Sequence, residues 1–408
     1  MADRPVHADS TVPPGAGGGS RQTGIGPARR DDPAELFAAA RQGDRRSLAR
    51  LLTMVEAGGH RGRAVAAVAY RSGAEPRTVG ITGAPGAGKS TLTGRLIAAA
   101  RSGGVDQLAV VAVDPTSPFS GGAVLGDRVR MQDHALDPGV YIRSMATRGH
   151  LGGLSLAVPE AVRVLGAAGM PLVLVETVGV GQVEVEVASA TDTTVVVVNP
   201  RWGDAIQANK AGLMEIADIF VVNKADMPGA RETVADLQQM LDLGGARHRP
   251  PRGRPHGGDV GGEGRAGGQG GETSPEGAKD RGSGPTGHGD DDPGQQPWRP
   301  PIVETIAASG DGVGDLWAAI GAHQRYLDGG GVLAERRRQR LETELQRVLD
   351  ARIAAEVAEL GRGDLAGVRQ AVLDHDLDPY AAADRLLGEV GRRAASGRHA
   401  PLPEPPGR

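Results

Sequence analysis

The chain has 408 residues and a formal net charge of −4 at pH 7, and it contains no cysteine. The lack of cysteine excludes disulfides, thiolate metal sites and cysteine nucleophiles, and it fits a reducing cytoplasm. The acidic balance and an aromatic content of 2% argue against a general nucleic-acid binder, which would need a basic face and stacking rings. No apolar run approaches the ~18 residues of a membrane span, and the first thirty residues lack the apolar segment of a secretion signal. We therefore expect a cytoplasmic protein without nucleic-acid or membrane partners.

Helical spacing dominates the chain from residue 32 to residue 75. Asp32 suits a helix N-cap and Pro33 a first helical turn. Apolar residues then recur at helical intervals, at Leu36, Phe37, Leu48, Leu51, Leu52 and Val55. We expect a disordered tail at 1–31, followed by an N-terminal helical segment at 32–75 with two or three helices over 33–72.

A glycine-rich segment of the form G-x-x-x-x-G-K-[ST] begins at Gly83 and ends at Ser90. A short apolar strand precedes it at 78–82 and a helical pattern follows it, which is the context of a phosphate-binding loop. In such a loop, backbone N–H groups surround a polyphosphate, Lys89 reaches the β- and γ-phosphates, and the Ser90 hydroxyl binds Mg²⁺. The alternative is a glycine-rich turn that only caps a helix. The expected phosphate contacts are Gly83, Ala84, Pro85, Gly86, Ala87, Gly88, Lys89, Ser90 and Thr91.

Apolar runs of strand type alternate with helical patterns downstream of this loop. The expected strands are 78–82, 108–113, 140–144, 172–176, 194–198, 219–222 and 302–306. Because these runs are apolar on both faces, we expect an α/β fold of the P-loop NTPase class, with a mostly parallel sheet and helices on both faces. This domain would span 76–325.

Two of the expected strands end in carboxylates. Asp114 follows the second strand, and Glu176 leads into a glycine-bearing turn that contains Gly179. Carboxylates at strand ends beside a phosphate loop are suited to hold Mg²⁺ and its waters, and the turn can donate an N–H group to a γ-phosphate. Each carboxylate alone could instead be an ordinary helix cap.

The apolar run at 219–222 ends in Asn223, Lys224, Ala225 and Asp226, which is the N-K-x-D pattern of guanine recognition. The Asp226 carboxylate can accept hydrogen bonds from both the ring N–H and the exocyclic amine of guanine, whereas adenine presents the wrong pattern. A solvated turn after a strand is the alternative. The order after a phosphate loop favours a guanine nucleotide, GTP or GDP, whose base would also meet Ala307 and Ala308 after the last strand.

The segment 251–300 contains 16 Gly and 7 Pro and interrupts this order. Such a composition buries too little surface to offset its ordering entropy, so we expect a disordered insertion at about 246–297.

A long amphipathic helix follows, with Leu341, Leu345, Val348, Leu349, Ile353, Val357 and Leu360 three or four residues apart. We expect a C-terminal helical dimerisation region at 326–396 and a tail at 397–408; packing on its own domain is the alternative for these helices.

These segments together resemble the methylmalonyl-CoA mutase-associated GTPases of the MeaB and ArgK type. The resemblance rests on G-A-P-G-A-G-K-S-T, V-D-P-T-S-P, G-G-A-V-L-G-D-R-V-R-M, V-E-T-V-G-V-G-Q and N-K-A-D. It covers roughly 33–245 and 297–395, and it also includes the Arg45–Arg50 helix and the element that begins at Asp378.

The resemblance implies a homodimeric GTPase that chaperones an adenosylcobalamin-dependent acyl-CoA mutase, gating cofactor loading and protecting the mutase. It implies that Asp114, Asp127 and Glu176 organise Mg²⁺ and water, and that Lys210 lies in a third switch that reports the nucleotide state. The catalytic candidates are Lys89, Asp127, Glu176, Gln182 and Lys210.

Three departures from the pattern of G proteins matter. Val180 stands where Ras-like proteins have a water-orienting glutamine, so we expect hydrolysis that is slow alone and stimulated by a partner. The loop after the last strand has Ala307-Ala308 where Ser-Ala is more frequent in G proteins, and the insertion is unusual for the family.

Two alternative functions stay open, that of a metal-insertion GTPase and that of a protein kinase or ATPase of the amino-acid transport type.

Overall fold

The fold was analysed in a computed structural model, which describes residues 32–115, 134, 136–147, 153–177, 183–200, 215–243, 297–360 and 362–395. The expected tails at 1–31 and 397–408 and most of the insertion lie outside these residues. Within them, no helix is both long and apolar enough to cross a bilayer.

Seven parallel strands form one sheet among the described residues, in the order β3-β2-β4-β1-β5-β6-β7. Their bounds are β1 Arg77–Gly83, β2 Leu108–Pro115, β3 Val140–Thr147, β4 Leu172–Thr177, β5 Thr193–Val198, β6 Ile219–Asn223 and β7 Ile302–Thr305. Every expected strand is present, and its ends differ from the expected ones by at most three residues. The last strand ends at Thr305 because Ile306 leaves the sheet and forms an antiparallel bridge with Asp311.

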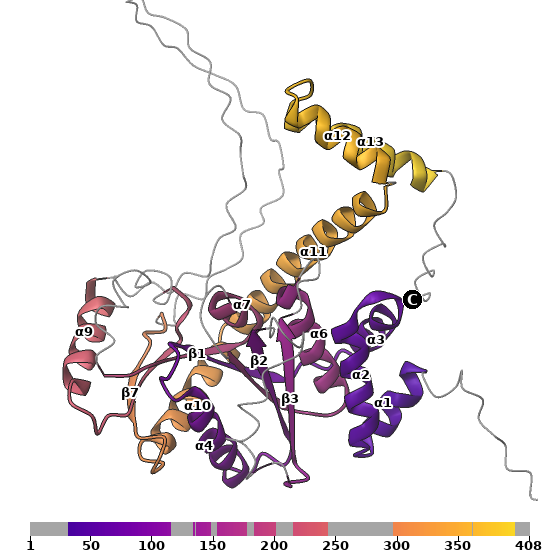
Figure 1. The fold of residues 1–408 in the computed structure, drawn as a ribbon. Coiled ribbons are helices and arrows are strands. Elements are labelled where there is room, and N and C mark those ends of the chain that lie inside the picture. The colour runs from indigo at the N-terminus through magenta and orange to yellow at the C-terminus, as the bar shows by residue number, and fades with distance from the viewer. Residues whose placement is uncertain are drawn as a thin grey trace, which may run out of the picture.

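Helices cover both faces of this sheet (Figure 1). The described helices are α1 Pro33–Arg41, α2 Arg45–Ala57, α3 Gly59–Arg71, α4 Lys89–Ser102, α6 Gly153–Ala167, α7 Val183–Ala190, α9 Ala230–Leu243, α10 Val313–Asp328, α11 Val332–Glu359, α12 Arg362–Leu373 and α13 Pro379–Ala395. This arrangement confirms an α/β fold with a parallel sheet.

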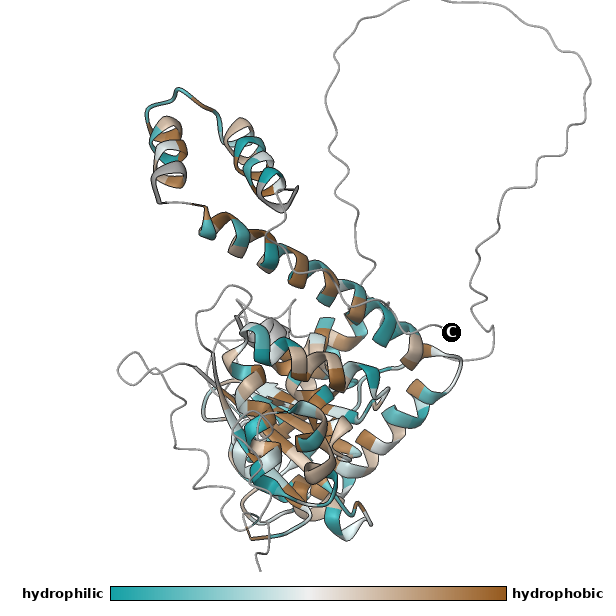
Figure 2. Cartoon of the chain, turned by 90° about the vertical axis from the view of Figure 1, so that its right-hand side faces the viewer, coloured by the Kyte–Doolittle hydropathy of each residue, from teal (hydrophilic) through white to brown (hydrophobic). Residues whose placement is uncertain are grey.

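Alternate residues of the strands face two different cores. In β2, Ala109, Val111 and Val113 pack with α6, α7 and the N-terminal helices, whereas Leu108 and Val110 pack with α4 and α10. A third cluster lies between β6 and α9. Figure 2 shows the apolar residues concentrated in this layered part of the molecule. The apolar character of the strands on both faces thus follows from their burial on both faces.

The N-terminal segment contains three helices, and the predicted cap is confirmed, since the Asp32 side chain accepts a hydrogen bond from the backbone N–H of Ala34 at 3.1 Å. Leu36, Phe37, Leu51 and Leu52 are buried in the core on the side of the sheet that α6 covers. The three helices are therefore part of the main core, packed outside α6.

The C-terminal helices form an arm. The helix α11 begins beside the sheet and extends away from it, and it carries the α12–α13 hairpin at its far end (Figures 1 and 2). Arginines near the start of α11 hold it in place: Arg337 and Arg340 bind the buried carboxylate of Asp192, and Arg336 binds that of Asp218. Both aspartates directly precede strands, β5 and β6, so the arm is anchored at the amino ends of the strands.

Candidate nucleotide-binding site

The phosphate loop connects β1 to α4, and its glycines are required by close contacts. Gly83 has φ 133°, and a Cβ there would lie 2.0 Å from the carbonyl oxygen of Val197. Gly88 has φ 94°, and a Cβ there would lie 2.3 Å from the Asn223 side chain. Any larger residue would displace either the sheet or the loop that carries Asn223. The loop therefore has the tight curvature on which phosphate binding depends.

Lys89 occupies the concave side of this loop. Its ammonium group donates hydrogen bonds to the carbonyl oxygens of Gly83 at 2.7 Å and Ala84 at 3.1 Å, and the residue is buried. Lys89 is also the first residue of α4, whose N-cap Gly88 provides no side-chain acceptor for the first N–H groups of the helix. A buried cation at the positive end of a helix dipole is a binding site for a polyphosphate.

Ser90 and Glu176 form a second polar pair beside the loop. The Ser90 hydroxyl donates to Oε1 of Glu176 at 2.6 Å, and both residues are buried. Glu176 lies in β4 opposite Ile81 of β1, so the sheet places it next to the phosphate loop. A hydroxyl and a carboxylate are hard oxygen donors of the kind that Mg²⁺ prefers, and the pair fits a magnesium ion bound with nucleotide phosphates. The backbone of Asp114 lies at the end of the neighbouring β2, while its side chain lies outside the described part.

Asn223 joins the phosphate loop to the loop after β7. Its amide nitrogen donates to the carbonyl oxygen of Ala87 at 2.7 Å. Its amide oxygen accepts from the Thr305 hydroxyl at 3.1 Å and from the backbone N–H of Ala307 at 3.0 Å. Both ends of the buried amide therefore bind protein groups, and Asn223 fixes the relative position of the loops that would hold phosphate and base.

Lys224 and Asp226 of the N-K-x-D segment are less buried than Asn223. Lys224 has φ 60°, and its ammonium donates to the carbonyl oxygen of Gly86 at 2.9 Å, which places its side chain along the phosphate loop. Asp226 is exposed. Of the expected base contacts, Ala307 is buried and Ala308 is exposed. The structure thus brings a second cation, Lys224, to the phosphate loop and leaves the Asp226 carboxylate accessible to solvent.

Arg95 of α4 was missed by the sequence reading. Its guanidinium donates to the carbonyl oxygens of Ala307 at 3.1 Å and Ala308 at 2.5 Å, and so ties the loop after β7 to the phosphate-loop helix. No motif marks this residue, because its partners are backbone atoms more than 200 positions away. The anchor of the arm was also missed, although the run R-R-R-Q-R at 336–340 could have suggested acidic partners.

Several expected site residues lie outside the described part of the chain. They are Asp127, Gly179, Gln182 and Lys210. Pro85 and Thr91 are exposed at the phosphate loop and in the first turn of α4, respectively.

Comparison with known proteins places this geometry in a family. Residues 48–361 match the family described as methylmalonyl Co-A mutase-associated GTPase MeaB. A protein of Pyrococcus abyssi that is named as a GTPase is 44% identical over 357 residues, covering 87% of this chain and 96% of the relative. The mouse methylmalonic aciduria type A homolog, a mitochondrial protein, is 29% identical over 374 residues, covering 86% of this chain and 78% of the relative.

A solved structure supports the fold. The crystal structure of a LAO/AO transport system kinase matches with a TM-score of 0.57 and 23% identity, covering 88% of this chain and 97% of that one. With its phosphate loop, its Ser90–Glu176 pair and its N-K-x-D loop on one parallel sheet, the chain belongs to the methylmalonyl-CoA mutase-associated GTPases of the MeaB family and is a P-loop GTPase.

Proposed function

We propose that this GTPase regulates an adenosylcobalamin-dependent acyl-CoA mutase, such as methylmalonyl-CoA mutase or a relative, as its chaperone. It would gate loading of the cofactor and protect the mutase from inactivation. The observation that carries the proposal is the match of residues 48–361 to a family described by its association with methylmalonyl-CoA mutase. The name of the mouse relative refers to a disorder of methylmalonate and supports the same client.

The nucleotide chemistry divides among a few side chains. Lys89 and the first N–H groups of α4 would bind the β- and γ-phosphates of GTP. Ser90 and Glu176 would hold Mg²⁺, with Asp114 and Asp127 completing the acidic set. Bound Mg²⁺ neutralises charge that develops on phosphate oxygens during hydrolysis.

The base would be selected at the loop that Asn223 fixes. The exposed Asp226 carboxylate would accept from the two guanine donors, while the loop of Ala307 and Ala308 would lie at the guanine oxygen. Because Asn223 already binds protein at both ends, its contribution to affinity would be to hold these groups in register. We expect GDP to bind far more tightly than ADP, and Asp226→Asn to shift preference toward xanthosine nucleotides.

The arm supports a homodimer as part of this function. Along α11, Leu341, Leu345, Leu349 and Ile353 are 37%, 70%, 48% and 38% exposed, at intervals of four residues. Four large apolar side chains on one stretch of a helix favour pairing with another apolar surface. We propose that two copies pair through this stripe and present two GTPase sites to the mutase.

Single-turnover GTP hydrolysis, with and without apo-mutase, tests the function. We expect slow hydrolysis that the client mutase accelerates, with methylmalonyl-CoA, isobutyryl-CoA and ethylmalonyl-CoA mutases as candidates. Lys89→Ala should abolish nucleotide binding. Lys210→Ala should bind GTP as the wild type does but lose the stimulation, since its loop would act only against a partner. A Lys210→Ala protein that is fully stimulated contradicts its assignment, and no response to any of the mutases contradicts the chaperone function.

A further inference from the structure

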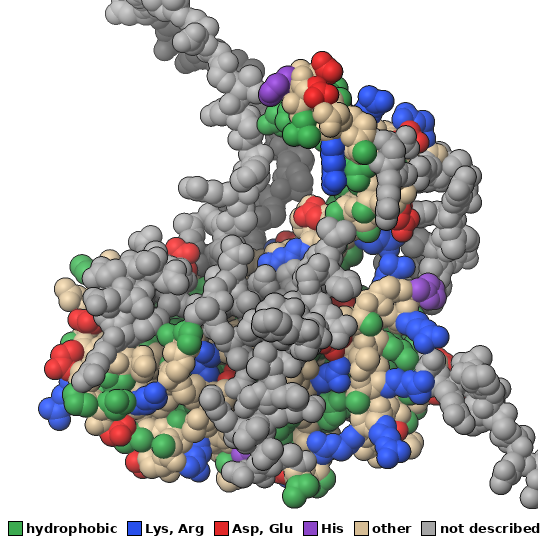
Figure 3. Space-filling view, in the orientation of Figure 1, with side chains coloured by type: hydrophobic (Ala, Val, Ile, Leu, Met, Phe, Trp, Pro, Cys, Tyr) green, Lys and Arg blue, Asp and Glu red, His purple; other side chains and the backbone are tan. Residues whose placement is uncertain are grey.

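Positive charge is concentrated on α2 and α3. Between residues 45 and 71 the sequence has six arginines and one glutamate, although the whole chain has a net charge of −4. The one glutamate, Glu56, is bound to Arg143 at 2.6 Å. Basic side chains gather over this part of the molecule in Figure 3. The exposed ones are Arg45, Arg46, Arg50, His60, Arg61, Arg63 and Arg71. This basic surface suits an acidic partner.

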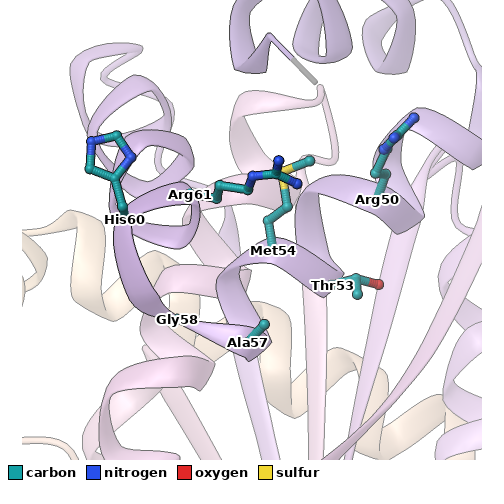
Figure 4. Close-up of a pocket in the computed structure, with 7 residues that line it drawn as sticks. All are labelled: Arg50, Thr53, Met54, Ala57, Gly58, His60 and Arg61. Atoms are coloured by element: carbon teal, nitrogen blue, oxygen red, sulfur yellow. The ribbon is translucent and has the colours of Figure 1, made fainter. Parts of the chain in front are cut away.

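A hollow of about 420 Å³ lies within the basic surface. Figure 4 shows its lining from both helices: Arg50, Thr53 and Met54 from α2, and His60 and Arg61 from α3. The Met54 side chain is nearly buried and gives the hollow an apolar component, while the arginines make its rim cationic. An aromatic ring flanked by carboxylates fits such a hollow, because guanidinium groups bind both carboxylates and ring faces.

The tip of the arm has the complementary chemistry. The turn between α12 and α13 carries Asp374, Asp376 and Asp378, all exposed. Leu373 and Tyr380 on either side are 72% and 86% exposed. Large apolar side chains so exposed beside three carboxylates indicate a surface that contacts a basic, partly apolar partner.

The tip lies far from the basic surface of its own chain. The helix α11 has 28 residues and is about 42 Å long at 1.5 Å per residue, and the α12–α13 hairpin at its far end stands apart from α1–α3 (Figures 1 and 2). At its base, α11 packs against α6, and α6 packs against α2 and α3. Two arms paired in antiparallel fashion along the apolar stripe would bring the tip of each near the base of the other, on the side of α6.

We propose that the tip of one arm, Asp374–Tyr380, binds the basic surface on α2 and α3 of a second copy of this chain. Tyr380 enters the hollow beside Met54, and the aspartates pair with Arg50 and Arg61. The contact rests on the proposed homodimer and extends it, because it joins the arm of one protomer to the main domain of its partner.

Charge reversal in the full-length protein tests this contact. The first variant carries Arg50→Glu and Arg61→Glu, and the second carries Asp374→Lys and Asp376→Lys. By sedimentation equilibrium at low salt, we expect the dimer dissociation constant of each variant to rise about tenfold or more. An equimolar mixture should restore wild-type affinity, since in the mixed dimer both contacts again pair opposite charges. Tyr380→Ala should weaken the dimer and Tyr380→Phe should not.

The controls separate this contact from folding and from the dimer itself. Arg299→Glu changes an exposed arginine near β7 and should leave dimerisation unchanged. All variants should keep the wild-type melting temperature at concentrations where every one of them is monomeric. A wild-type protein that is monomeric at every concentration overturns both the contact and the homodimer. A wild-type dimer whose two reversed variants associate normally, or whose mixture shows no recovery, overturns the contact and leaves the homodimer standing.

Discussion

The anchor of the arm provides a direct test of how the C-terminal helices are held. Asp192 has a side chain that is 1% exposed. It accepts hydrogen bonds from Arg337 at 2.8 Å, from Arg340 at 3.2 Å and from the backbone N–H of Thr78 at 3.1 Å. Burial alone would raise the pKa of Asp192, but the two arginines and the Thr78 N–H hold it below its usual value of 3.8. We expect Asp192→Asn to destabilise the protein at neutral pH.

The magnitude follows from the burial of the partners. The side chains of Arg337 and Arg340 are 16% and 21% exposed, so removing the carboxylate charge leaves two largely buried cations without it. Breaking a buried ion pair costs about 3–5 kcal/mol. The asparagine oxygen can still accept one hydrogen bond, which reduces the expected loss to about 2–4 kcal/mol. At roughly 2 °C per kcal/mol for a chain of this size, the melting temperature should fall by about 4–8 °C.

Thermal unfolding of the GDP-bound protein, followed by circular dichroism, measures this loss. Because the folded-state pKa of Asp192 is lowered, the wild type's advantage should be complete above about pH 5 and should disappear as the pH falls through the folded-state value. Glu342→Gln on the same helix is the matched control: Glu342 and its partner Arg338 are both about 60% exposed, and such a pair contributes less than about 1 kcal/mol. If Asp192→Asn melts within about 1 °C of the wild type at pH 7, the ion pairs do not hold the arm.

Two further predictions concern the contact of α6 with the arm and the loop after β7. Burial raises the pKa of Glu160 to about 7, with Arg163 opposing and Glu344 adding to the rise. Its ionisation therefore destabilises the folded protein as the pH rises above the usual pKa of 4.5. Glu160→Gln should stabilise the protein by up to ~3 kcal/mol at pH 8, seen as a higher melting temperature, and should leave the melting temperature unchanged at pH 5. Equal melting temperatures of variant and wild type at pH 8 contradict this. Arg95→Met should weaken GDP binding about tenfold in titration calorimetry, because two hydrogen bonds to the loop after β7 are lost, whereas Arg95→Lys should retain part of the affinity. Unchanged GDP affinity would show that Arg95 does not position that loop.

The strands and the phosphate loop could be predicted because their signals are local. A run of apolar residues such as that at 172–175 indicates a strand with both faces buried, and the structure buries the whole of β4. The glycines at 83 and 88 likewise reflect contacts that any chain with this loop must accommodate. Local pattern, however, cannot order strands: β1 lies between β4 and β5, an arrangement set by packing over long stretches of chain.

The parts that could not be predicted depend on contacts between distant residues. Asp192 and Asp218 look like ordinary polar residues before a strand, and only the docking of α11 buries them against arginines about 120–150 positions away. The division of the C-terminal region into α12 and α13 was not predicted, because α12 has only 12 residues and few apolar ones at helical spacing, Leu365, Val368 and Val372. Asn223 was expected at the base, yet its amide binds Ala87 and Ala307, a role that depends on the relative position of two loops.

The proposed function depends on a partner that senses the nucleotide state, and reciprocity gives its most direct test. If a mutase prefers one nucleotide state of this GTPase, it must change the affinity for that nucleotide by the same factor. The measurement is the affinity for GDP and for a non-hydrolysable GTP analogue, with and without each candidate apo-mutase, by fluorescent-nucleotide titration. We predict that one mutase shifts the ratio of the two affinities by about fivefold or more. An unchanged ratio with every adenosylcobalamin-dependent acyl-CoA mutase would contradict the account and leave a GTPase whose client is of another class.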